Sequence, residues 1–263
     1  MKIFFSAGLL GLFLCLLPVS ALAADWQELK GDHFIIYYDK NGDFAKETLR
    51  FAETYYTRIA SDLGYARHSD FWQWENRVEI YLYPTEAEYL KATGQPAWSK
   101  GVANYTDKKI SSFVWSQGFQ DSLLPHEIAH LIFRDFVGFK GEVPLWLDEG
   151  VAQWQEPRAR QMARQAGHQV YTERGILPFD DFTEVNTTKL DTFSEKSVHQ
   201  FYMQALSVVD YLIQYKGTQV FAEFCRQLRE GKGLNEALGF AFGGDLLNLD
   251  ALQNKWIKYV TEV

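Results

Sequence analysis

The sequence predicts an α+β fold, in which a small N-terminal sheet with one long helix precedes a mainly helical lobe. Between residues 33 and 115, short runs of β-branched and aromatic residues alternate with helical patterns, which indicates a sheet with accompanying helices. From about residue 121 onward, apolar residues recur mostly with the period of a helix. With 263 residues, 47% of them hydrophobic, the chain is long enough for one substantial core or two cooperating lobes.

The elements of the N-terminal part follow from apolar patterns that end at glycine, asparagine or proline. Runs of Val, Ile, Tyr and Phe mark strands, and a polar turn at 40–43 ends the first of them. Apolar residues at helical spacing mark a long helix that stops at Gly64. We expect, in order, a strand at 33–38, the helix at 44–63, a strand at 78–83, a short helix from Glu86, and a strand pair at 101–105 and 110–115.

The first 23 residues have the pattern of a signal peptide. A positive start at Lys2 precedes an apolar run at 3–17, and Ala21-Leu22-Ala23 forms a small-x-small cleavage site. An uncleaved membrane anchor is the rival interpretation, but the apolar run is short and Pro18 follows it. We therefore expect a mature chain of residues 24–263 without a stable membrane span, exported to the periplasm or fully secreted.

Charge and cysteine content restrict the partners and the chemistry. The net charge is −8 and no basic stripe is visible, which argues against nucleic acid as the main partner. Cys225 is the only cysteine after residue 23, so the mature chain has no internal disulfide. Its neighbours follow a helical apolar pattern, which predicts a packing residue. Any metal ligands must then be histidines and carboxylates.

The run His126-Glu127-Ile128-Ala129-His130 is the most informative motif of the chain. On a helix, histidines at i and i+4 project from one face and can bind one metal ion. The surrounding residues predict that helix: Asp121 or Ser122 can cap it, Pro125 is tolerated in its first turn, and Gly138 is placed to end it.

A second predicted helix begins at Pro144 and carries Glu149, in Trp146-Leu147-Asp148-Glu149-Gly150. The connection between the two helices is short, so we expect them to pack as neighbours and to bring Glu149 to the histidines. Three protein ligands leave one position open for water, which is typical of a catalytic zinc site. The alternative is a surface helix whose histidines merely pair with carboxylates. Adjacent Asp148 points away from Glu149 on a helix and is suited to support a ligand or to cap.

These motifs resemble those of the gluzincin metallopeptidases, with the spacing of aminopeptidase-N-type enzymes. The mature chain is more closely similar to small bacterial peptidase-MA-like proteins, through Asp32-His33-Phe34, Ala52-Glu53-Thr54-Tyr55-Tyr56 and Lys255-Trp256-Ile257-Lys258-Tyr259-Val260. The resemblance implies one zincin-like catalytic domain at 24–263, with an α/β lobe at 24–115 and a helical lobe with the zinc site at 116–263. It also implies hydrolysis of peptides or proteins in the cell envelope.

The resemblance assigns a role to each site residue. His126, His130 and Glu149 would hold Zn²⁺, and Glu127 would act as general base toward the activated water. A tyrosine on a later helix stabilises the oxyanion in aminopeptidase-N-type enzymes, and the matching residue here is Tyr202. A core aromatic without a catalytic role remains the alternative for Tyr202.

The sequence departs from the aminopeptidase pattern where those enzymes anchor a free amino terminus. The Gly-x-Met-Glu-Asn segment is absent, and the comparable segment at 101–105 has no glutamate. We therefore expect endopeptidase-like or other specificity, with 101–105 either an edge that pairs with a peptide or an ordinary sheet edge. Two further alternatives remain open. One is a zinc-bearing binding or chaperone-like envelope protein without turnover. The other is an envelope interaction protein in which some of the eight tryptophans, among them Trp72, Trp74, Trp98 and Trp115, line a groove for peptide or glycan, although tryptophans mostly pack in the core.

Overall fold

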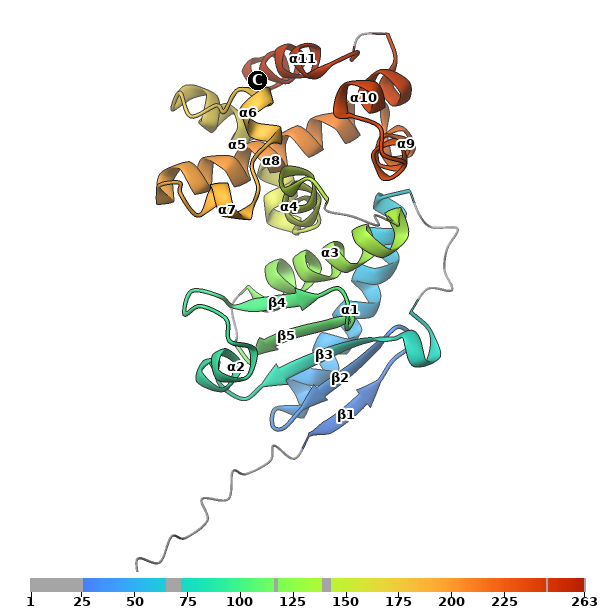
Figure 1. Ribbon diagram of the computed structural model, residues 1–263. Helices are drawn as coiled ribbons and strands as arrows, with labels where there is room; N and C mark the ends of the chain where they lie inside the picture. The colour runs from blue at the N-terminus through green and yellow to red at the C-terminus, as the bar shows by residue number, and fades with distance from the viewer. Residues whose placement is uncertain (1–25, 65–71, 116–117, 139–142, 245, 263) are drawn as a thin grey trace, which may run out of the picture.

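The structure is a computed structural model that describes residues 26–64, 72–115, 118–138, 143–244 and 246–262. The expected signal peptide at 1–23 lies outside these residues. A sheet with two associated helices forms one part of the molecule, and a set of helices forms the other (Figure 1). The α+β prediction is therefore confirmed, including the order of the two parts along the chain.

The described strands form one five-stranded sheet in the order β1-β2-β3-β5-β4. The three inner strands run parallel, whereas β1 and β4 pair antiparallel at the two edges. All predicted strands are present within one or two residues; β1 was not predicted, because its sequence Gln-Glu-Leu-Lys lacks the pattern of a strand. The strands are β1 (Gln27–Lys30), β2 (Phe34–Tyr38), β3 (Val78–Tyr83), β4 (Gly101–Asn104) and β5 (Lys109–Phe113).

Helix α1 (Gly42–Asp62) packs against β2, and α2 (Glu86–Thr93) packs beside β3 and β5. Alternate residues of β2, namely Phe34, Ile36 and Tyr38, are buried, as expected of a strand with one face on the core. Helix α3 (Leu124–Val137) contacts α1 and β4 on one side and α4 (Leu145–Trp154) on the other. It therefore lies between the sheet and the remaining helices (Figure 1).

Helix α8 is the centre of the helical part and packs against α4, α5, α9 and α11. Gly150 allows the close approach of α4 to α8, since a Cβ at this position would lie 2.6 Å from the Ala205 carbonyl oxygen. The remaining helices are α4 (Leu145–Trp154), α5 (Pro157–Thr172), α6 (Phe179–Thr183), α7 (Thr187–Leu190), α8 (Glu195–Lys216), α9 (Thr218–Arg229), α10 (Leu234–Phe242) and α11 (Leu249–Thr261).

Two further predictions can be compared with the described residues. Cys225 is fully buried in α9, which confirms that it is a packing residue. Trp74 and Trp98 are 76% and 80% exposed, whereas Trp72 is buried in the core.

Within the described ranges, no helix combines the length and the apolar character that crossing a membrane requires.

Candidate metal centre

Helix α3 presents the two histidines of the motif on its buried side. It does not begin with a side-chain cap at Asp121 or Ser122, so that prediction was wrong. A π-helical turn at Phe119–Leu123 runs directly into α3, and this continuity satisfies the first backbone amides. Pro125 lies in the first turn, and Gly138 ends the helix in the left-handed conformation with φ 74°, both as predicted.

Helix α4 brings Glu149 to these histidines. The Nε2 atoms of His126 and His130 lie 3.1 Å apart, and the Glu149 Oε2 atom lies 3.6 Å from the first and 4.0 Å from the second. Two donors that each lie about 2.1 Å from a tetrahedral zinc are separated by roughly 3.4 Å. Two imidazole nitrogens and one carboxylate oxygen are also the donors zinc prefers, so the three residues fit this ion. Among the described residues, they form the one group that could hold a metal.

A carboxylate lies behind each histidine. The Asp148 Oδ1 atom is 3.0 Å from His130 Nδ1, and the Glu156 Oε1 atom is 2.9 Å from His126 Nδ1. When each Nδ1–H donates to its carboxylate, each Nε2 lone pair is directed to the common point of the three ligands. Asp148 therefore occupies the supporting position expected from the sequence. Glu156 was missed, because no motif connects it to His126.

The pKa values of His126 and Asp148 are set by the charged groups beside them. Burial alone would lower the pKa of His126, but the contacts with Glu149 and Glu156 outweigh burial and raise this pKa to about 10. Burial would raise the pKa of Asp148, but the adjacent His130 holds it below its usual value. A cation bound here would compensate the negative charge of the same carboxylates.

Glu127 is buried next to the histidines, on the first turn of α3. Its side chain is largely inaccessible, and burial raises the pKa of its carboxyl above the usual value. The backbone of Ala103, on edge strand β4, lies near this carboxyl and offsets part of the rise in its pKa. A carboxyl group with a raised pKa beside a metal group can accept and return a proton near neutral pH.

Tyr202 lies on α8, near enough to Glu149 for the charge of that carboxylate to affect its pKa. Gln153 of α4 donates from Nε2 to the Tyr202 carbonyl oxygen at 3.2 Å, which connects the two helices at this point. Burial, and secondarily the negative charge of Glu149, raise the pKa of the Tyr202 phenol. The hydroxyl therefore stays protonated and can donate a hydrogen bond. His199, one turn earlier on α8, is exposed.

A cavity of about 640 Å³ opens beside the metal group. Glu149, Asp148, Tyr105 and Arg134 line it, with the Arg134 guanidinium 4.5 Å above the Tyr105 ring. The remaining lining comes from Val143, Pro144, Leu145, Thr183, Glu184, Val185, Asn186, Thr187 and Thr188. The cavity can hold part of a ligand in contact with Glu149, one of the three candidate metal ligands.

A family model described as the Peptidase MA superfamily matches residues 69–262. The matched range includes α3, α4 and α8, and with them every residue of the candidate metal centre. A search of curated proteins returned no match.

Proposed function

The chain belongs to the Peptidase MA superfamily, and on that premise we propose that it is a zinc-dependent peptidase of the gluzincin type. The observation that carries the proposal is the convergence of His126, His130 and Glu149, whose ligand atoms lie within 4.8 Å of one another. Superfamily membership indicates a metallopeptidase acting on peptides. The donor set favours zinc, and the ligand from a second helix favours the gluzincin type.

Three residues of the chain would hold the ion, and two carboxylates would orient its histidine ligands. Zinc bound there would lower the pKa of water and polarise the carbonyl of a scissile peptide bond. His126 and His130 would bind through Nε2, because Glu156 and Asp148 accept hydrogen bonds from their Nδ1 atoms. Glu149 would supply the one negative charge in direct contact with the ion.

Glu127 and Tyr202 would handle the proton and the developing negative charge. Glu127 would accept a proton from the attacking water and later donate it to the leaving amine, for which its raised pKa is suitable. The Tyr202 hydroxyl, kept protonated by its own raised pKa, would donate to the oxyanion. Donors that are already in place before the reaction contribute most of such stabilisation.

The substrate would bind along the edge of the sheet. Strand β4 pairs with β5 along one edge, and no described strand pairs with its other edge. A peptide could therefore pair there. Strand β4 packs beside α3, and its Ala103 backbone lies near enough to Glu127 to affect the pKa of that carboxyl, so this edge lies beside the proposed base. An extended peptide paired with β4 would pass the metal group and could extend toward the 640 Å³ cavity. We propose internal cleavage, because no glutamate of the 101–105 segment could anchor a free amino terminus.

We also propose that the protein is exported to the cell envelope, on the basis of the signal-peptide pattern at 1–23. Amino-terminal sequencing of the protein recovered from an envelope fraction is expected to begin at Ala24. An intact Met1 in that fraction would refute cleavage.

The experiment that tests the function measures zinc and cleavage on the same sample. Purified protein is analysed for zinc, and wild type and Glu127→Gln are incubated with a broad peptide mixture whose products are identified by mass spectrometry. We expect one zinc per chain in both proteins and a loss of cleavage of at least about 10²-fold in the variant. Zinc without Glu127-dependent cleavage would favour the binding or chaperone-like alternative, and absence of zinc would refute the metal centre.

A further inference from the structure

We propose that Glu156, anchored by Ser122, is a positioning residue that orients His126 for the metal ion. The inference rests on the proposed metal centre and adds a residue that neither the motifs nor the family match assigns. Glu156 lies seven residues after Glu149, outside α4, and reaches the site from the junction of α4 and α5.

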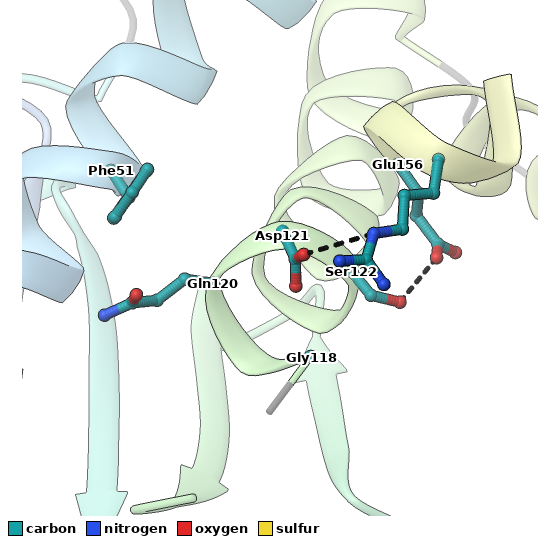
Figure 2. A pocket seen from close by; sticks show the side chains of 7 residues that line it. Phe51, Gly118, Gln120, Asp121, Ser122 and Glu156 are labelled. Atoms are coloured by element: carbon teal, nitrogen blue, oxygen red, sulfur yellow. Dashed lines mark hydrogen bonds and ion pairs between the residues drawn. The ribbon is translucent and has the colours of Figure 1, made fainter. Parts of the chain in front are cut away.

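Both carboxylate oxygens of Glu156 are engaged. Oε1 lies 2.9 Å from His126 Nδ1, and Oε2 accepts a hydrogen bond from the Ser122 hydroxyl at 2.5 Å. Figure 2 shows the Ser122 and Glu156 side chains pointing toward each other. Since one oxygen is held by Ser122, the other has little freedom to leave the imidazole. The ring of His126 is thereby fixed with Nε2 toward His130 and Glu149.

Glu156 lies at the capping position of α5, but its carboxylate contacts His126 instead. Glu156 precedes the first turn of α5, where a side chain commonly accepts hydrogen bonds from the helix amides. Its carboxylate makes no such bond, and Pro157 at the start of α5 removes one amide that would need it. The carboxylate is therefore directed to His126 rather than used to cap its own helix.

The junction that carries Glu156 is fixed to α1. Arg58 donates to the carbonyl oxygen of Gln155, and Arg160 forms an ion pair with Asp62 at 2.6 Å. The Arg160 guanidinium also lies 3.6 Å above the Trp154 ring. Contacts on both sides of Glu156 thus hold the backbone in place, so that the carboxylate meets His126 in a defined geometry.

The two supporting carboxylates have different surroundings. Asp148 is buried beside His130, whereas Glu156 and Ser122 form part of the wall of a cavity of about 790 Å³ (Figure 2). Asp121 lines the same cavity but pairs with the exposed Arg158 at 3.8 Å, away from the histidines. Asp121 is therefore a matched control: it is a carboxylate in the same cavity without a contact to a proposed ligand.

The test measures metal affinity of the full-length chain rather than activity. Zinc dissociation constants are determined by chelator competition for wild type, Glu156→Gln, Glu156→Ala, Ser122→Ala and Asp121→Asn. We expect affinity to fall about 10-fold in Glu156→Gln and up to about 100-fold in Glu156→Ala. Ser122→Ala should lose about threefold, since one anchoring hydrogen bond is removed, and Asp121→Asn should match wild type.

A second readout separates orientation of a ligand from general support of the fold. The visible absorption of cobalt(II) bound at saturation reports the arrangement of the ligands, and we expect it to change in Glu156→Gln but not in Asp121→Asn. If Glu156→Ala does not fold, Ser122→Ala and Glu156→Gln still decide the question. Wild-type affinity and wild-type cobalt spectra in Ser122→Ala and in the folded Glu156 variants would overturn the inference and leave the proposed function standing. A wild-type protein that binds no zinc would overturn both.

Discussion

Replacing Gly150 with alanine should both destabilise the protein and weaken zinc binding. The added methyl group would lie 2.6 Å from the Ala205 carbonyl oxygen and 2.7 Å from Val209 Cγ2, closer than packed atoms approach. Overpacking costs about 1–3 kcal/mol, and here about 2–3 kcal/mol, because the nearest atom is a backbone oxygen rather than the end of a flexible side chain. The better helix propensity of alanine offsets about 1 kcal/mol of this cost. We expect a net loss of about 1–2 kcal/mol and a Tm lower by about 2–8 °C. Because Glu149 is the preceding residue, the shift of α4 should also reduce zinc affinity by about tenfold.

Thermal unfolding in the presence of a chelator measures the first effect without a contribution from bound metal. Gly233→Ala is the matched control, since its backbone φ is −65° and no atom lies within 4 Å of an added Cβ. Because Gly233 is the N-cap of α10 and alanine is a poorer N-cap residue than glycine, this control should lose at most about 1 kcal/mol. A Gly150→Ala protein with wild-type Tm and wild-type zinc affinity would refute the close approach of α4 to α8.

Two other predictions concern the chemistry of the site. Tyr202→Phe removes the hydroxyl alone, so kcat for peptide cleavage should fall about 10²-fold while zinc affinity and Tm stay close to wild type; unchanged kcat would leave Tyr202 a packing residue. Apparent zinc affinity should rise about tenfold per pH unit between pH 6.5 and 9, because His126, with a pKa raised to about 10, must lose its proton to bind the ion. Calorimetry in two buffers of different ionisation enthalpy should show proton release at pH 7, and affinity independent of pH would contradict this protonation state.

The strands and the long helix could be predicted because burial imposes a period on their sequences. Strand β3 is predicted to the residue, since Val78, Ile80 and Leu82 are buried in strict alternation. The grouping of His126, His130 and Glu149 could also be predicted, because helical spacing and a short connection between helices nearly determine it. The roles of these residues in catalysis remain predictions.

Features that depend on tertiary contacts could not be predicted in the same way. Strand β1 is mostly exposed and polar and exists because its backbone pairs with β2. The π-helical turn before α3 replaces the expected cap, and no residue pattern distinguishes the two starts. The contact of Glu156 with His126 depends on the angle of the α4–α5 junction, which α1 holds through Arg58 and Asp62. Such a contact links elements whose relative positions are set by the whole fold.

The most direct test of the metal centre compares zinc binding by wild type and Glu149→Ala. Both proteins are stripped with a chelator and titrated with zinc against a competing indicator, and circular dichroism verifies that the variant is folded. We predict one zinc per wild-type chain and an affinity at least about 100-fold lower in Glu149→Ala, because one of three protein ligands and its negative charge are lost. A folded Glu149→Ala protein with full zinc affinity would show that the ion is held elsewhere.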